Sequence, residues 1–218
     1  MCGIVGSLVR IGDQSVGNRV LAACKALLHR GPNDQGLIDQ DLDGGRICLG
    51  HRRLSIIDLS DAAKQPMRTS DGRYTMVFNG EIYNYKELRK KLRGLGYKFD
   101  SNSDSEVLLV AWQAWGESCL NKLKGMYSFV IYDRVTQTLN CVRDPFGIKP
   151  FFYRNDEDGF HSASEIGAIR HFLTPISSTE FLSSLFPFNK LPLFFNYLVL
   201  ISASLIELLV PLFVIYSL

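Results

Sequence analysis

Charged residues are scarce towards the end of this chain. The 218-residue sequence holds 24 Lys and Arg and 22 Asp and Glu residues, but only Glu180, Lys190 and Glu207 lie from position 180 onward. A break in composition of this kind is typical of a boundary between parts of a protein. We therefore predict a folded soluble domain over residues 1–173 and an apolar tail of a different kind over residues 174–218.

Other features are missing from the sequence, and each absence excludes a class of protein. The net charge is only +2 and no arginine-rich stripe with interleaved aromatic residues is present, so we expect no nucleic-acid partner. The start has no basic segment followed by an apolar one, so secretion by a signal peptide is not indicated and a cytoplasmic protein is expected. No internal repeat or low-complexity segment precedes the tail.

The five cysteines are an odd number at wide, irregular spacings, and no pair forms a CxxC motif. Neither a disulfide framework nor a metal site is expected from this pattern. Four of them lie in apolar or mixed stretches and are interpreted as small core residues: Cys24, Cys48, Cys119 and Cys141.

Cys2 differs from the other cysteines because removal of Met1 would make it the N-terminal residue. It would then carry both a thiol, with a pKa near ~8.5, and an α-amino group, with a pKa near ~7.7, that can accept the thiol proton. Such a cysteine is a nucleophile that needs no histidine. Taken alone, a Cys at position two equally fits a buried first strand.

Short apolar runs predict an α+β fold of layered sheets covered by helices. A helix is expected over residues 17–29 and a loop over 29–34, while the pairs Asn84/Glu87 and Ser103/Glu106 resemble helix caps. Strands are predicted at residues 2–9, 46–50, 74–79, 127–132, 138–143 and 150–153.

Three further positions could carry chemistry, and each has a structural alternative. Arg53, in the pair Arg52-Arg53, could clamp a carboxylate, or both arginines could be solvated surface residues. Asn79-Gly80 could donate hydrogen bonds to an oxyanion, or form a hairpin turn. Asp104 could bind a cation, or be stabilised by the dipole of the helix that it begins. Together with Cys2 they would suit a small amino-acid amide.

Seven ordered segments resemble the glutaminase domain of glutamine-hydrolysing asparagine synthetases. They begin at Met1 (MCGIVG), His29 (HRGPNDQG), Gly50 (GHRRLSIIDLS), Phe78 (FNGEIYN), Ser103 (SDSE), Gly125 (GMYSF) and Arg143 (RDPFGIKP). This resemblance implies a class II glutamine amidotransferase with the αββα sandwich of the N-terminal-nucleophile hydrolases. One departure is Asn33, where the family usually has Asp.

The resemblance also implies roles for individual residues. Cys2 would attack glutamine to form a thioester, with its own amino group as the base, and Asn79 and Gly80 would form the oxyanion hole. Arg53 would bind the glutamine α-carboxylate, and Glu81 and Asp104 would bind its α-ammonium. Arg30 would order the loop over the site. No metal or cofactor is implied for glutamine hydrolysis.

The resemblance ends near residue 169, and the Ser-Gly-Gly-x-Asp-Ser phosphate loop of a synthetase domain is absent from the sequence. ATP and magnesium would belong to that missing domain. The chain alone should then not make asparagine, but it could hydrolyse glutamine or deliver ammonia to a separate synthetase. The stretch 191–218 is long enough for a membrane helix, although Pro192, Pro211 and Glu207 disfavour one. A truncated or altered end and a partner-binding segment are the alternatives. A catalytically idle remnant that acts through its tail is the second functional hypothesis.

Overall fold

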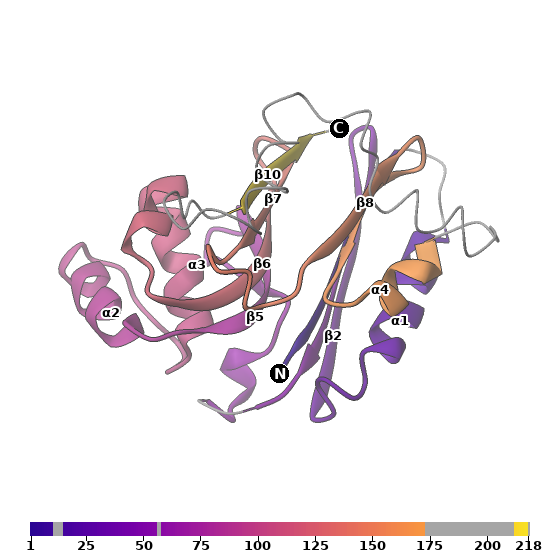
Figure 1. The fold of residues 1–218 in the computed structure, drawn as a ribbon. Helices are drawn as coiled ribbons and strands as arrows, with labels where there is room; N and C mark the ends of the chain where they lie inside the picture. Colours follow the sequence, from indigo (N-terminus) through magenta and orange to yellow (C-terminus); the bar gives the residue numbers. More distant parts are fainter. Residues whose placement is uncertain (11–14, 56–57, 173–211, 218) are drawn as a thin grey trace. The chain divides into compact units, whose positions relative to one another are not determined.

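The computed structural model of the protein describes residues 1–10, 15–55, 58–172 and 212–217, which form two antiparallel β-sheets and the helices around them (Figure 1). These residues belong to one compact unit. The first sheet has the strand order β2-β3-β1-β9-β8. Its strands are β1 (Gly3–Arg10), β2 (Asp34–Leu42), β3 (Gly45–Arg53), β8 (Phe152–Asp156) and β9 (Gly159–Ala163).

The second sheet has the order β10-β7-β6-β5-β4. Its strands are β4 (Met67–Arg68), β5 (Tyr74–Ile82), β6 (Gly125–Asp133), β7 (Thr138–Arg143) and β10 (Leu212–Ser217). Each neighbouring pair is antiparallel, and short connections join β4 to β5 and β6 to β7.

Helices cover the outer faces of the two sheets. Helices α1 (Val16–Ala26) and α4 (Ile166–Ile169) pack on the first sheet, and α2 (Tyr85–Gly94) and α3 (Asp104–Trp115) lie on the second (Figure 1). Three short 3₁₀ turns complete the described elements: η1 (Asp61–Ala63), η2 (Gly116–Lys122) and η3 (Arg170–Phe172).

Two hydrophobic layers hold these elements together. One layer lies between the sheets and joins residues such as Ile4 and Leu49 of the first sheet to Val77 and Val130 of the second. Another lies between the second sheet and its helices, where Phe129 packs edge-on against Trp112 at 6.0 Å between ring centroids. The layers therefore follow the order helix, sheet, sheet, helix, which agrees with the αββα sandwich predicted from the sequence.

The strand register brings the ends of three strands to one place. Gly3 at the start of β1 pairs with Arg52 near the end of β3, so Cys2 lies beside the residues that follow β3. The two sheets meet near the same point, where His51 Nε2 contacts the backbone oxygen of Phe78 in β5 at 3.2 Å. A carbonyl oxygen can only accept, so this ring nitrogen donates.

Two interpretations of polar segments as surface features were wrong. Asn79 and Gly80 are not a hairpin turn, because they pair with Ser128 and Tyr127 inside β5 and β6. Arg52 and Arg53 end strand β3, where only 8% and 7% of their surface is exposed, so they are not solvated loop residues.

The two predicted helix caps had different outcomes. Ser103 caps α3 as expected, since its Oγ accepts a hydrogen bond from the Glu106 N–H at 3.2 Å. Asn84 makes no side-chain cap for α2; its amide bonds instead to the backbone of Lys122 and Lys124. Strands β2, β4 and β9 were not predicted, and β8 begins two residues later than expected.

Residues 174–211 and 218 of the predicted apolar tail lie outside the described residues. Leu212–Ser217, within the stretch that was considered as a membrane helix, forms strand β10 against β7. Among the residues that the structure describes, no helix is long and apolar enough to cross a membrane.

Candidate active site

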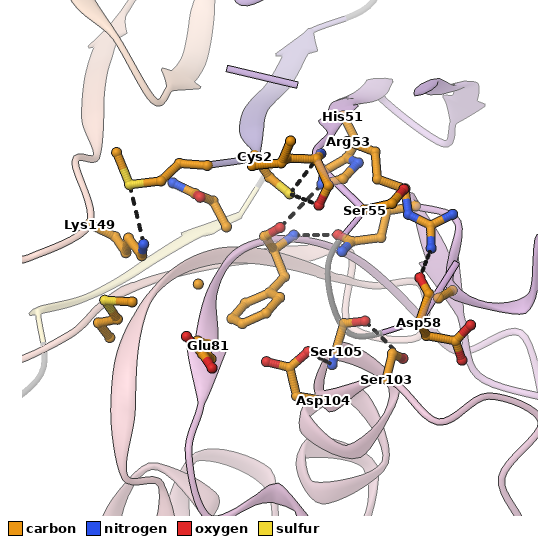
Figure 2. A pocket seen from close by; sticks show the side chains of 18 residues that line it. Cys2, His51, Arg53, Ser55, Asp58, Glu81, Ser103, Asp104, Ser105 and Lys149 are labelled. Carbon is orange, nitrogen blue, oxygen red and sulfur yellow. Dashed lines mark hydrogen bonds between the residues drawn. The ribbon is translucent and has the colours of Figure 1, made fainter. Parts of the chain in front are cut away.

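A cavity of about 190 Å³ opens where the start of β1, the end of β3, the end of β5 and the start of α3 meet (Figure 2). The predicted site residues Cys2, Arg53, Asn79, Gly80, Glu81 and Asp104 all line it. Arg30 is not among the lining residues. The structure thus brings together side chains that are spread over a hundred residues of sequence.

Cys2 is held by the segment that follows β3. The backbone N–H of Leu54 points at Cys2 Sγ at 3.4 Å, and Sγ lies 3.7 Å from the Leu54 oxygen. Burial raises the pKa of the Cys2 thiol, while the Leu54 N–H and the Arg53 charge oppose that rise. Because the thiolate is the nucleophilic form, a thiol in this state needs a base close by.

Asn79 is the most unusual polar residue of the cavity. Its side chain is 1% exposed, and neither Nδ2 nor Oδ1 has a hydrogen-bond partner among the described residues. Burying an amide without partners costs about 1–3 kcal/mol, so such a group is expected to have a partner in a ligand. Gly80 follows it, and an added Cβ there would lie 2.4 Å from the Met126 oxygen. A side chain at position 80 is therefore excluded by close packing of β5 on β6.

The Arg53 guanidinium lines the cavity, and two of its nitrogens already donate hydrogen bonds to the backbone. Nη1 donates to the backbone oxygen of Ser60 at 3.1 Å, and Nη2 donates to that of Asp58. Neither acceptor is a carboxylate, so the positive charge is oriented by these bonds without being neutralised by them. An anionic group in the cavity would complement it.

Two acidic residues lie at the floor of the cavity in the view of Figure 2. Asp104, 6% exposed, accepts the Ile82 N–H at Oδ2 (2.9 Å) and the Ser105 N–H at Oδ1 (2.9 Å). Burial raises its pKa against these hydrogen bonds, and the Glu81 charge adds to the rise. Both carboxylates would be stabilised by a cationic ligand group.

Arg30 acts on Cys2 from outside the cavity. Its Nε donates to the backbone oxygen of Cys2 at 3.0 Å, and its Nη1 pairs with Glu165 Oε1 at 2.8 Å. It therefore fixes the main chain of the cysteine directly, in addition to whatever loop it orders.

The lining residues to which the sequence interpretation gave no role include His51 and Lys149. His51 is 1% exposed, and burial lowers its pKa to about 4, so it is a neutral link between the sheets. Lys149 belongs to a segment that contributed only to the family resemblance, and its side-chain direction has no signal in the sequence. Among the described residues, no three His, Cys, Asp or Glu side chains are grouped to hold a metal ion.

Comparison with known families identifies the domain. A family model described as "Glutamine amidotransferase domain" matches residues 1–193. This chain belongs to that family. The resemblance found in the sequence motifs is thereby confirmed.

Relatives with a similar sequence are asparagine synthetases. The chain is 40% identical over 170 residues to "Asparagine synthetase [glutamine-hydrolyzing] 1" of Bacillus subtilis, a match that covers 76% of this chain and 26% of that protein. It is 34% identical over 183 residues to "Putative asparagine synthetase [glutamine-hydrolyzing] 2" of Methanocaldococcus jannaschii, covering 78% of this chain and 35% of that protein. The chain therefore spans about a quarter to a third of these relatives.

A solved structure supports the same fold. Glutamine phosphoribosylpyrophosphate amidotransferase from B. subtilis, in complex with ADP and GMP, superimposes with a TM-score of 0.64 at 24% sequence identity. The match covers 78% of this chain and 43% of that chain. The predicted αββα sandwich is confirmed at the level of the fold.

Proposed function

We propose that this domain hydrolyses glutamine to glutamate and ammonia through a thioester on Cys2. The observation that carries the proposal is the buried Asn79 amide, which has no partner among the described residues and lines the same cavity as the Cys2 thiol. A donor in this position is useful when charge develops on the carbonyl oxygen of a substrate amide. The family membership and the relatives support glutamine as that substrate.

The chemistry begins after removal of Met1, which converts the nitrogen of Cys2 from an amide into a basic amine. The amine takes the thiol proton, and the thiolate attacks the side-chain amide carbon of glutamine. Asn79 Nδ2 and the Gly80 N–H stabilise the tetrahedral oxygen. The C–N bond then breaks, the ammonium returns its proton to the leaving nitrogen, and ammonia departs. Water attacks the thioester, which yields glutamate and restores the thiol.

Charges around the cavity suit the amino-acid end of glutamine. Arg53 carries a guanidinium that no carboxylate of the described residues neutralises, and it would bind the α-carboxylate in a fork. Asp104 and Glu81 would receive the α-ammonium. This arrangement would exclude amides that lack either charged group.

The use of the ammonia is proposed from the relatives. Their names describe asparagine synthetases that hydrolyse glutamine, and this chain covers only about a quarter to a third of them. We propose that a synthetase in the cytoplasm receives the ammonia, and that ATP and magnesium act at that synthetase, while glutamine hydrolysis needs no cofactor.

Glutamate release from glutamine tests the function. The whole chain, with Met1 removal verified by mass spectrometry, is compared with Cys2→Ala and with Cys119→Ala, which changes a buried core cysteine away from the cavity. Release by the parent protein and Cys119→Ala, and its loss in Cys2→Ala, would support the proposal. If the processed parent protein released no more glutamate than Cys2→Ala, the catalytically idle remnant would be the better description.

A further inference from the structure

Lys149 brings a positive charge into the cavity beside Cys2. It lies between strands β7 and β8, is only 4% exposed, and lines the same cavity as Cys2 and Glu81. In Figure 2, Lys149 and Arg53 lie on opposite sides of Cys2. The proposed hydrolysis of glutamine through the Cys2 thioester assigns no role to Lys149.

The segment that carries Lys149 is held rigidly. Asp144 Oδ1 accepts the N–H groups of Phe146 and Ile148 at 3.1 and 3.0 Å. Its Oδ2 accepts the N–H of Lys149 at 3.0 Å, and Arg143 Nε donates to the Lys149 oxygen at 2.7 Å. The backbone on both sides of the Lys149 side chain is therefore fixed, so the direction of that side chain is built into the fold.

The ammonium group of Lys149 lacks a strong partner. Within the part of the chain that the structure describes, its Nζ meets one acceptor, Met1 Sδ, at 3.3 Å. A thioether sulfur is a weak acceptor, and buried charges are normally paired. Removal of Met1 takes away even this contact and turns the Cys2 nitrogen into an amine in the cavity that Lys149 also lines. A buried cation and a newly formed base would then share one cavity.

From this placement, we propose that Lys149 is a positioning residue whose charge keeps the Cys2 α-amine neutral and favours the thiolate, so that the base can accept the thiol proton at neutral pH. The inference rests on the proposed glutamine hydrolysis. An ammonium close to an amine disfavours a second positive charge there, and it attracts the negative charge that forms on sulfur.

Other charged groups near Cys2 have ion-pair partners or several hydrogen bonds, whereas Lys149 does not. Arg30 pairs with Glu165, and the Asp144 carboxylate accepts four backbone N–H groups. Bound glutamine would offset the remaining charges, since its α-carboxylate faces Arg53 and its α-ammonium faces Asp104 and Glu81. Asp58 lies at the rim beside Arg53, and His51 is neutral. Lys149 then has no carboxylate within hydrogen-bond distance of its Nζ among the described residues.

The test is the pH dependence of kcat/KM for Lys149→Met, which keeps the length of the side chain and removes its charge. Activity on the acid side falls when the base becomes protonated, so loss of the cation should move that limb to higher pH by about one unit. At pH 6 the variant should be about tenfold slower than the parent protein, and at pH 9 within about twofold. Lys149→Arg should keep the parent profile, and exposed Lys124→Met serves as the matched control.

A second measurement does not depend on catalysis. Cys2 is the one cysteine of the five that is not buried, so iodoacetamide should label it selectively, with Cys2→Ala giving the background. The labelling rate follows the thiolate fraction, and its pH midpoint should also rise in Lys149→Met. If Lys149→Met shifted neither the acid limb of the kcat/KM profile nor the pH midpoint of iodoacetamide labelling, the proposed role of Lys149 would be overturned. Loss of hydrolysis in the parent protein would instead count against the proposed function, and the labelling profile would still decide on Lys149.

Folding is checked in the same variants by thermal unfolding. Removal of an unpaired buried ammonium should leave Tm unchanged or raise it. A large drop in Tm with an unshifted pH profile would identify Lys149 as a merely structural residue and would contradict the proposal.

Discussion

His51 in β3 joins the first sheet to the second by donating from Nε2 to the Phe78 backbone oxygen at 3.2 Å. Phe78 directly precedes Asn79, so this bond fixes the proposed oxyanion donor relative to the sheet that carries Cys2. Burial, and not this bond, keeps the His51 imidazole uncharged. A structural link of this kind makes the stability of the domain depend on pH.

We expect the unfolding free energy to decrease as the pH falls from about 6.5 towards 4. Burial lowers the pKa of His51 to about 4 and that of His161 to about 3, whereas histidine in the unfolded chain has a pKa of about 6.5. In this window the unfolded chain binds protons that the folded chain excludes. Each group then contributes a slope of up to about 1.4 kcal/mol per pH unit.

His51→Gln provides the matched comparison, because its amide can still donate to Phe78 but does not titrate. Urea unfolding at pH 7, 6 and 5 should show a shallower loss of stability in this variant than in the parent protein. Equal slopes in the two proteins would mean that His51 does not titrate on unfolding as described.

Asn79→Ala should lower kcat while changing KM little. The Asn79 amide is proposed to act on charge that appears only in the transition state, and loss of one oxyanion donor costs about 2.7–4 kcal/mol. The variant also removes a buried amide whose atoms have no partner among the described residues, so its unfolding free energy should not fall greatly. Steady-state kinetics with glutamine check the first point and urea unfolding the second. A raised KM with unchanged kcat would assign Asn79 to ground-state binding.

Arg53→Lys should raise KM for glutamine more than it lowers kcat. Two donors of Arg53 are bonded to backbone oxygens of Asp58 and Ser60, and a lysine ammonium cannot keep these bonds and also grip a carboxylate in a fork. Glutamine kinetics, with an amide that lacks the α-carboxylate as comparison, measure the effect. If the variant discriminated between the two amides as well as the parent protein does, Arg53 would not be the carboxylate ligand.

The sequence predicted the site better than it predicted the elements that carry it. Cys2, Arg53 and Asp104 each had a structural alternative, and the family resemblance assigned their roles; all three do line one cavity. Asn79 and Gly80 were open to a turn interpretation, since their strong local turn preference is overridden by pairing with β6.

The elements that were missed are those with weak local signals. Strand β2 mixes Asp and Gln with Leu and Ile and has no fully buried position, and β9 contains Gly, His and Ser that become buried only through tertiary packing. Lys149 could not have been placed from sequence either. The direction of its side chain depends on two backbone hydrogen bonds, which the Lys149 N–H donates to Asp144 and the Lys149 oxygen accepts from Arg143. These bonds form only in the folded loop.

The final prediction concerns Met1, whose retention should abolish hydrolysis and leave the fold intact. With Met1 in place, the nitrogen of Cys2 is an amide without basicity, and Met1 itself lines the cavity where glutamine would bind. A bulky residue inserted between Met1 and Cys2 would block trimming, because trimming requires a small side chain at the second position. Mass spectrometry would verify retention, and an unchanged Tm would show an intact fold.

In a parallel design, a protease-cleavable extension ending directly before Cys2 should give inactive protein that gains glutaminase activity on cleavage. Equal activity before and after cleavage would rule out the Cys2 amine as the base.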